Sequence, residues 1–271
     1  MIGSTTWEKK GLSIVQQILK NPMATWISTQ QREAIVAIAK RQRDVMALLK
    51  TGGGKSMLAI VPAMLFPHEA VVVVLPLRSL IMDWHHKLTA MDIAHQIFDP
   101  SQNRGRLDIN INLILVSADK AKYSSWRTAL AEFHQTVPIT RMVFDEAHIV
   151  LLASDYRDSL KHVIELREYD TQLILLSGTV PPTSEEALKK AFGLISDTTV
   201  IRESSNRPEL EYILEQPLSS SAICDKIIQI AMQQHRSWTS EDRGLIFVTY
   251  MEDGQKLAAK VRDIIFNAHV N

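Results

Sequence analysis

Cysteine is almost absent from this 271-residue chain, which contains a single one, Cys224. One thiol excludes an internal disulfide bond and any zinc site built from several cysteines. The shortage fits a reducing compartment, and Cys224 is expected to be a small buried hydrophobic residue. Disulfide and zinc–thiolate chemistry are therefore not expected to stabilise this fold.

An excess of charge of either sign is also missing. Thirty Lys and Arg residues balance thirty Asp and Glu residues, so the net charge at pH 7 is zero. A polyanionic partner would then have to be held by a local patch or by main-chain donors. Composition alone does not indicate nucleic-acid binding.

Long apolar runs are lacking as well. The longest, residues 70–75, is far too short to span a bilayer, and the N-terminal residues contain no apolar targeting segment. These absences predict a soluble intracellular protein without a membrane partner, which would be nuclear if the source is eukaryotic.

The sequence does contain short β-branched runs that alternate with longer stretches of helical period. This pattern is typical of βα units that feed a parallel sheet, so the predicted fold class is α/β. The predicted strands are Val45–Leu49, Ala70–Leu75, Asn112–Val116, Arg141–Phe144, Leu173–Ser177 and Thr198–Arg202. The predicted crossover helices are Ser56–Leu65, Ser79–Met91, Ala121–His134, Asp155–Leu166 and Ser184–Phe192.

The two flanks of this region differ from it. Amphipathic helices are predicted at Leu12–Lys20 and Thr29–Gln42, before the first strand. After a linker near residue 205, the sequence predicts the start of a second α/β unit. Its elements are a strand at Leu210–Leu214, a helix at Ala222–Gln234, a strand at Gly244–Val248 and a helix from Asp253. The predicted domains are therefore a helical lead-in (1–28), a main domain (29–204) and an incomplete unit (205–271).

The segment TGGGKS predicts a phosphate-binding loop. Its three glycines allow a tight turn with inward-facing N–H groups, and a helix that begins near Lys55 directs its positive end to the same point. Lys55 is expected to reach the β- and γ-phosphates of ATP, and Ser56 to offer its hydroxyl to Mg²⁺. Leu49 replaces the first glycine of the strict pattern. The predicted cofactor-binding residues are Thr51, Gly52, Gly53, Gly54, Lys55 and Ser56.

The segment VFDEAH predicts the catalytic acids. An apolar strand end delivers Asp145 and Glu146 to the carboxyl edge of the sheet, where open α/β folds bind ligands. Asp145 suits an outer-sphere contact with Mg²⁺, and Glu146 suits orienting or deprotonating the attacking water. Alone, this short string could cap a helix. Its place after a P-loop, on a strand of the same sheet, favours phosphoryl transfer.

The run from Thr29 to Leu214 resembles the first motor domain of superfamily-two DNA helicases, most closely the RecQ group. In order, the segments TQQREAI, LLKTGGGKS, VVVVLPLRSLIMD, ILVSADK, VFDEAH and LLSGTVPP are similar to the Q motif and to motifs I, Ia, Ib, II and III. NRPELEYIL resembles the segment that leads into the second motor domain, and GLIFVTY resembles motif IV. The resemblance implies a RecA-like P-loop NTPase domain followed by a partial second RecA-like domain.

The resemblance also implies roles for further residues. Gln31, or alternatively Gln30, would contact the adenine base. The phosphates of a single DNA strand would be held by Pro76, Leu77, Arg78, Ser79, Ser117, Ala118 and Asp119. Residues that couple hydrolysis to movement would be His148, Ser177, Gly178 and Thr179. An ordinary helix cap at residue 79 and a plain strand-to-turn ending at 177–179 are the alternatives.

Several positions depart from the family pattern. Leu151 and Leu152 stand where a Gln-Trp pair senses DNA, so coupling between DNA and ATP is not assured by these residues. Lys50 replaces a proline and adds a cation near the phosphates, and Trp84 replaces a glutamine after LIMD. Motifs V and VI, with the arginine that neutralises transition-state charge, would have to follow motif IV, but the sequence ends at Asn271.

Three hypotheses follow. The first is a monomeric ATP-dependent DNA helicase of RecQ type, which acts in DNA repair and recombination and couples hydrolysis to 3′–5′ translocation and unwinding. The second is a truncated or degenerate homologue that binds ATP and nucleic acid without unwinding. The third, a P-loop ATPase that is not a helicase, is disfavoured by the ordered motifs Ia, Ib and III.

Overall fold

The chain forms two compact units, Met1–Asn206 and Arg207–Asn271. The computed structural model describes residues 4–102, 105–152, 169–204, 206, 210–214, 220–235, 239 and 241–268. The predicted helix at Asp155–Leu166 lies outside the described residues. Each unit is considered by itself below.

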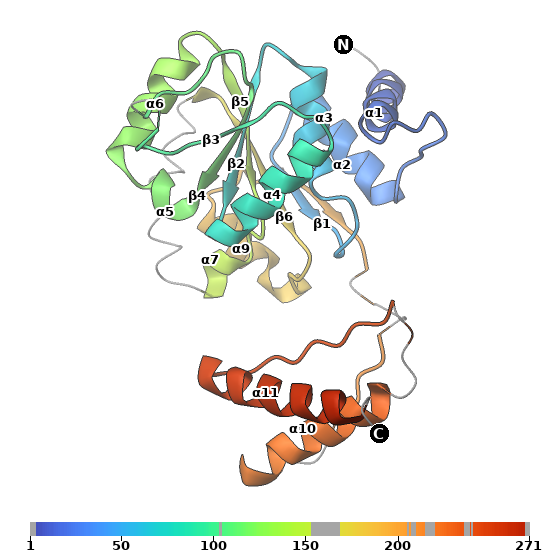
Figure 1. Ribbon diagram of the computed structural model, residues 1–271. Helices are drawn as coiled ribbons and strands as arrows, with labels where there is room; N and C mark the ends of the chain where they lie inside the picture. Colours follow the sequence, from blue (N-terminus) through green and yellow to red (C-terminus); the bar gives the residue numbers. More distant parts are fainter. Residues whose placement is uncertain are drawn as a thin grey trace. The chain divides into compact units, whose positions relative to one another are not determined.

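The first unit is built on a seven-stranded sheet in the order β3-β4-β2-β5-β6-β1-β7 (Figure 1). The strands are β1 (Val45–Leu48), β2 (Ala70–Leu75), β3 (Gln96–Ile97), β4 (Leu113–Ser117), β5 (Ile139–Phe144), β6 (Gln172–Ser177) and β7 (Thr199–Arg202). Every strand pair is parallel. Five strands, β1, β2, β4, β5 and β6, are buried along their whole length, as expected when both faces of a parallel sheet are covered. The predicted parallel α/β class is confirmed.

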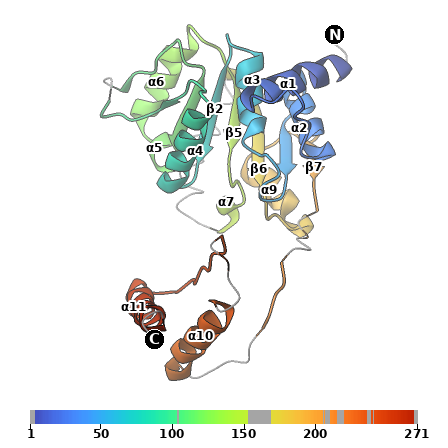
Figure 2. The same ribbon diagram turned by 45° about the vertical axis from the view of Figure 1, so that its right-hand side comes forward.

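Helices cover both faces of this sheet (Figure 2). One face packs against α1 (Ser4–Ile18), α2 (Thr29–Lys40), α3 (Met57–Leu65) and α4 (Arg78–Ala90). The other face packs against α5 (Ala118–Ala121), α6 (Ser124–His134), α7 (Ile149–Leu152) and α9 (Glu185–Ala191), the last of which follows the 3-10 turn η3 (Pro182–Ser184). Successive residues of each strand contribute to alternate clusters, so a single sheet supports two apolar cores.

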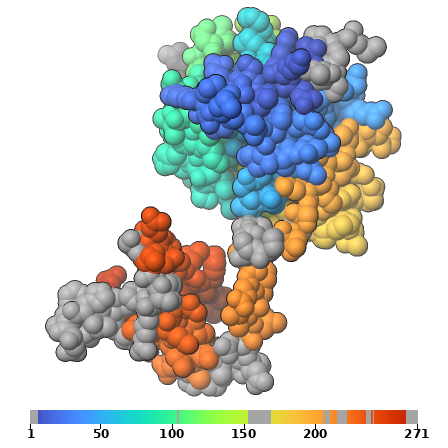
Figure 3. Space-filling model, turned by 90° about the vertical axis from the view of Figure 1, so that its right-hand side faces the viewer, coloured from blue at the N-terminus to red at the C-terminus, as the bar shows by residue number. Residues whose placement is uncertain are grey.

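The N-terminal helix begins earlier than predicted, at Ser4 rather than Leu12. The helix continues through Gly11, where the absence of a side chain allows close packing. A Cβ atom there would come within 3.1 Å of Ile35 and 3.2 Å of Trp26. The missing side chain lets α1 lie against α2, and both helices line one side of the first unit (blue in Figure 3).

Other boundaries differ where the sequence signal is weak. The predicted helix at Ala121–His134 is two helices, α5 and α6, because the backbone is extended at Tyr123. The two-residue strand β3 was not predicted, since so short a segment has no periodicity. The predicted strands of the first unit all form, and their first and last residues agree with the prediction within two residues.

The second unit contains the helices α10 (Ser220–His235) and α11 (Met251–Ala268). The strands predicted at Leu210–Leu214 and Gly244–Val248 are wrong, since neither segment forms a strand among the described residues. Backbone N–H and C=O groups form a ladder only with a neighbouring strand, and apolar side chains of both segments are exposed. Cys224 is half-buried rather than buried. None of the helices in the described ranges combines the length and apolar character of a membrane-spanning segment.

A part-buried ion pair joins the residue just before β2 to β5. Arg141 is 1% exposed, and its Nη1 donates to Glu69 Oε2 at 2.7 Å and to Thr140 Oγ1 at 2.9 Å. Its guanidinium also lies 4.3 Å from the ring centre of Phe66. Burial raises the pKa of Glu69, but hydrogen bonds from Arg141 and Thr140 outweigh it, so the pKa lies below its ordinary value.

We expect Glu69→Gln to lower the free energy of unfolding by about 2 kcal/mol at pH 7, because a buried cation loses its charged acceptor. Because the folded-state pKa of Glu69 is depressed, the ionised pair stabilises the protein above the unfolded pKa of 4.5, and that stabilisation is lost as pH falls through the folded value. Urea unfolding at pH 7 and pH 4 measures both effects. The control is Glu186→Gln, which removes an exposed pair with Lys189 and should change little.

Candidate nucleotide-binding and catalytic site

Three neighbouring strands bring the predicted site together. The P-loop follows β1 and the DEAH segment follows β5. Ser177 is the last residue of β6, and Gly178 and Thr179 come directly after it. These strands are adjacent in the order β5-β6-β1 and parallel. Their carboxyl ends therefore lie at one edge of the sheet, the usual ligand position in open α/β folds.

The P-loop turns tightly because two of its glycines are left-handed. Gly52 has a φ of 81° and Gly54 a φ of 73°, values that residues with a side chain rarely adopt. The N–H of Gly53 donates to the carbonyl of Lys50 at 2.9 Å. Helix α3 begins at Met57, one residue after the start of the predicted range Ser56–Leu65, and Ser56 is its N-cap residue without a capping side-chain hydrogen bond. The hydroxyl of this serine therefore has no capping role to compete with a metal contact.

Lys55 lies against the turn that follows β6. Its Nζ donates to the carbonyls of Leu49 at 3.3 Å and Lys50 at 3.4 Å. A Cβ atom on Gly178 would lie 3.4 Å from this Nζ and 3.7 Å from Thr51 Oγ1. Gly178 thus lies in van der Waals range of the ammonium group, at the point where two predicted motifs meet.

Asp145 is buried at this edge and is held by two donors. The indole Nε1–H of Trp84 donates to Oδ2 at 2.9 Å, and the N–H of Glu146 donates to Oδ1 at 3.0 Å. Burial raises the pKa of Asp145 above its ordinary value; the hydrogen bond from Trp84 and the charge of Lys55 act in the opposite direction. A metal cation at this position would favour the ionised carboxylate.

Glu146 adopts a left-handed backbone with a φ of 46°. This conformation costs about 1 kcal/mol for a residue with a side chain, and such strain is concentrated at functional sites. Its Oε2 lies 3.3 Å from His148 Nδ1. The hydrogen bond from His148 holds the pKa of Glu146 below its ordinary value, burial opposes this shift, and the charge of Lys55 lowers the pKa further. Lys55 therefore acts electrostatically on both acids of the DEAH segment.

His148 connects the DEAH segment to the turn after β6. Its Nδ1 lies 2.9 Å from Ser177 Oγ, and the same hydroxyl accepts a hydrogen bond from the N–H of Thr179 at 3.3 Å. The carbonyl of Ser177 accepts from the N–H of Leu49 just before the P-loop. His148, Ser177 and Thr179 thus form a continuous hydrogen-bonded path between motifs I, II and III.

Gln31 contacts the P-loop rather than facing solvent. It is 1% exposed; its Nε2 donates to the carbonyl of Gly54 at 3.4 Å, and its Oε1 accepts from the N–H of Ile27 at 3.0 Å. Gln30 is half-buried. Contact of either glutamine with adenine stays a prediction.

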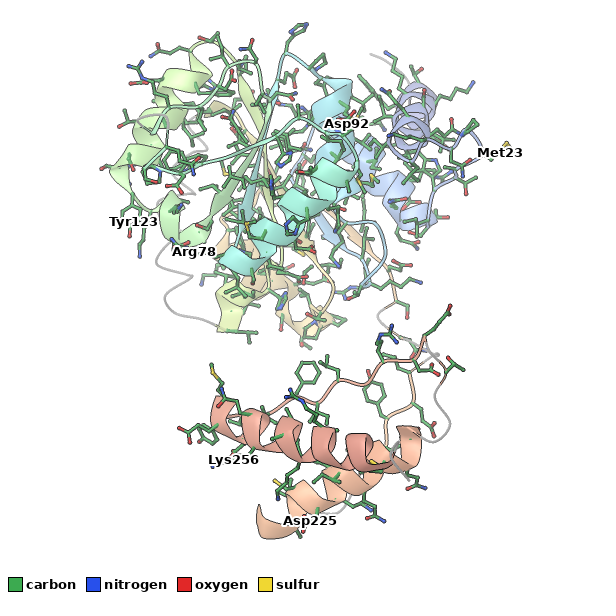
Figure 4. The ribbon with its side chains drawn as sticks, viewed as in Figure 1. Met23, Arg78, Asp92, Tyr123, Asp225 and Lys256 are labelled. Carbon is green, nitrogen blue, oxygen red and sulfur yellow. The ribbon has the colours of Figure 1, made fainter. Side chains whose placement is uncertain are left out.

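The predicted nucleic-acid residues lie at the ends of β2 and β4, which are also neighbours. Leu77, Arg78 and Ser79 are exposed at the start of α4, with Pro76 half-buried before them. In Figure 4, Arg78 stands at one end of α4 and Asp92 just beyond the other. Helix α4 has no side-chain cap, so main-chain N–H groups of its first turn are available to an anion.

The second group of predicted contacts, at residues 117–119, is mixed. Asp119 is exposed and pairs with Arg78 at 3.8 Å, whereas Ser117 and Ala118 are buried. Ser117 Oγ has no hydrogen-bond partner among the described residues. A pocket of about 380 Å³ lies between the two groups, and Lys120, which pairs with Asp99 at 3.0 Å, also lines it. The charges of this edge therefore largely cancel.

Sequence reasoning missed two contacts of the site. Trp84 lies on the buried face of α4 with Ile81 and Leu88. The three- and four-residue spacing of these side chains predicts that Trp84 is buried, but it does not reveal that Asp145 is its hydrogen-bond partner. Lys50, expected as a cation near the phosphates, pairs with Glu203 after β7 at 3.3 Å. Its charge is thus already matched. Neither partner could be found from local pattern.

A profile of DEAD/DEAH box helicases matches residues 28–187, more than half of the chain. This chain belongs to that family. Its curated relatives include the ATP-dependent DNA helicase Q-like SIM of Arabidopsis thaliana, 28% identical over 77% of this chain, and the RecQ-like DNA helicase BLM of Xenopus laevis, 28% identical over 68%. The ATP-dependent DNA helicase RecQ of Bacillus subtilis is 27% identical over 63% of the chain.

The chain spans only 26%, 14% and 30% of the lengths of these three relatives, respectively. Among solved structures, Saccharomyces cerevisiae Dbp5 bound to RNA and ADP BeF3 is similar with a TM-score of 0.70, 17% identity and coverage of 94% of this chain and 64% of that one. Mycobacterium smegmatis Lhr bound to ssDNA and AMP-PNP has a TM-score of 0.61 at 17% identity, covering 89% of this chain and 34% of that one. These structures support the helicase-domain fold.

We predict that Gly54→Ala weakens nucleotide binding about tenfold more than Gly52→Ala, since overpacking costs about 1 to 3 kcal/mol. The new methyl carbon would lie 2.1 Å from Gln31 Nε2 in the first variant, whereas nothing lies within 4 Å in the second. Both variants bear a left-handed backbone, so their difference reports the contacts of the new methyl group with Gln31 and with Ile27, whose Cδ1 would lie 2.9 Å away. Titration with a fluorescent ATP analogue measures it, and equal losses would show that these contacts do not shape the P-loop.

Proposed function

We propose that this chain is the nucleotide-binding part of an ATP-dependent DNA helicase of RecQ type, which couples ATP hydrolysis to 3′–5′ movement along a single strand and to duplex unwinding. The observation that supports it most directly is the meeting of Lys55, Asp145 and Glu146 at the carboxyl edge of β1, β5 and β6. Membership of the DEAD/DEAH box helicase family and RecQ-like relatives support the same activity.

The residues of the edge suit a Mg²⁺–ATP complex. Mg²⁺ prefers hard oxygen ligands and is bound through few protein groups plus phosphates. The hydroxyl of Ser56, which makes no capping hydrogen bond, and the carboxylate of Asp145 supply such oxygens. We propose that these two residues hold the metal, which would neutralise charge on the phosphates, while Lys55 binds the phosphates directly.

Glu146 is proposed to orient and deprotonate the attacking water. Its depressed pKa keeps the carboxylate ionised at neutral pH, which is the form that accepts a proton. The path through His148 and Ser177 to Thr179 would report the state of the nucleotide to the neighbouring turn. This is the proposed link between hydrolysis and movement.

DNA is proposed to bind along the ends of β2 and β4. Because Arg78 and Lys120 are each paired with a carboxylate, the strand would be held largely by main-chain N–H groups at the start of α4 and by the hydroxyl of Ser79. Contacts of this kind read no sequence, as a translocating motor requires.

A second candidate function is ATP and nucleic-acid binding without unwinding. It is favoured by Leu151 and by Leu152, which is 79% exposed, because these leucines stand where the resembling family carries its DNA-sensing Gln-Trp pair. An exposed leucine offers no polar group to a phosphate or a base edge. Such a protein would bind nucleotide but would not accelerate hydrolysis on DNA.

Phosphate release with and without a single-stranded oligonucleotide tests the proposal. We expect DNA-stimulated hydrolysis by the wild-type chain, loss of nucleotide binding in Lys55→Ala, and retained binding with hydrolysis reduced about 10²- to 10⁴-fold in Glu146→Gln, since only a proton acceptor is removed. Tight ATP binding by the Lys55→Ala variant would contradict the site assignment.

Strand displacement separates the two candidate functions. A motor of the proposed polarity should unwind a duplex with a 3′ overhang and leave one with a 5′ overhang intact. Thermal stabilisation by ATP without DNA-stimulated turnover would instead support the binding protein.

A further inference from the structure

Trp84 makes a buried contact with the proposed metal carboxylate. The residue is 3% exposed on α4, and its indole Nε1–H donates to Asp145 Oδ2 at 2.9 Å across 61 residues of sequence. A tryptophan nitrogen is a donor only, so the direction of this hydrogen bond is unambiguous. Oδ2 of Asp145 must be the acceptor.

The indole is held in place by its surroundings. Trp84 belongs to the apolar cluster between α4 and the sheet, together with Ile81 and Leu88 of the same helix. A large ring enclosed by close-packed neighbours cannot rotate toward solvent without disturbing them. The donor is therefore directed at Asp145 before any ligand binds.

The two donors leave Asp145 able to bind a metal. Trp84 holds Oδ2, and the N–H of Glu146 holds Oδ1. An ionised carboxylate has about four acceptor positions, so two remain for a cation. Hydrogen bonds of this kind orient metal ligands, and their loss typically weakens metal affinity about 10- to 100-fold.

We propose that Trp84 is a positioning residue that fixes the Asp145 carboxylate for Mg²⁺. The proposal rests on the proposed nucleotide function and adds a residue outside the P-loop and the DEAH segment. The contact occurs where the resembling family carries a glutamine, another N–H donor. Donation of an N–H, rather than the shape of the ring, is the property on which this role depends.

Two substitutions separate donation from packing. Trp84→Phe keeps an aromatic ring and loses the N–H, whereas Trp84→Gln keeps an N–H donor and loses the ring. In the presence of ADP we expect the apparent Kd for Mg²⁺ to rise about tenfold in Trp84→Phe, the effect typical of removing a residue that hydrogen-bonds to a metal ligand. Trp84→Gln should retain an affinity closer to that of the wild type. The reverse order would assign Trp84 a packing role and overturn the proposal.

Affinity for the nucleotide without Mg²⁺ provides the matched control. A fluorescent ADP analogue in EDTA should bind wild type and Trp84→Phe alike, because the carboxylate then has no metal to hold. If the wild type binds no nucleotide at all, the proposed function fails. If it binds and Trp84→Phe has unchanged Mg²⁺ affinity, only the positioning role fails.

The indole N–H resonance gives a readout that needs no variant to fold. The chain has five tryptophans, and the Trp84 indole cross-peak in a ¹H–¹⁵N spectrum can be assigned through its connectivity to the backbone resonances of Trp84. Addition of Mg²⁺ to the ADP-bound chain should shift this cross-peak, because the acceptor oxygen belongs to the carboxylate that binds the metal. An unmoved Trp84 cross-peak at saturating Mg²⁺ would contradict the proposal.

Discussion

The adjacency of three parallel strands is the constraint on which the candidate site depends. Because β5, β6 and β1 are neighbours with one direction, the segments that follow them must emerge at the same edge. The ladder continues past the strands: the N–H of Leu49 donates to Ser177, and the N–H of Ala147 donates to Leu176. Main-chain hydrogen bonds thus locate the P-loop, the DEAH segment and the turn after β6 before any side chain contributes.

On this backbone, a few polar contacts set the chemistry. Lys55 stands beside a glycine and acts on both acids, while His148 joins Glu146 to Ser177. The two acids of the DEAH segment occupy different environments: Asp145 is buried beside an indole, and Glu146 lies next to a histidine. Burial raises the pKa of Asp145 and the hydrogen bond from His148 lowers that of Glu146, so two carboxylates adjacent in sequence differ in their electrostatic surroundings.

Helix α4 brings the proposed DNA edge and the proposed metal site onto one rigid element. Its first turn carries Arg78, and less than two turns later Trp84 contacts Asp145. A helix transmits displacement along its axis because its internal hydrogen bonds resist bending. The neutral balance of charges at the DNA edge, with Arg78 and Lys120 both paired, agrees with the zero net charge of the chain.

The sequence by itself determined every strand of the first unit except β3, the P-loop and the acids after β5, because β-branched runs, glycines and carboxylates act through local geometry. Only the tertiary structure decided the strand order, the burial of Gln31 against Gly54 and the partner of Trp84, since these depend on residues far apart in the chain. The segments Leu210–Leu214 and Gly244–Val248 illustrate the same limit. Their residues favour strands, but a strand needs a neighbour to accept its hydrogen bonds, and local sequence does not encode that neighbour.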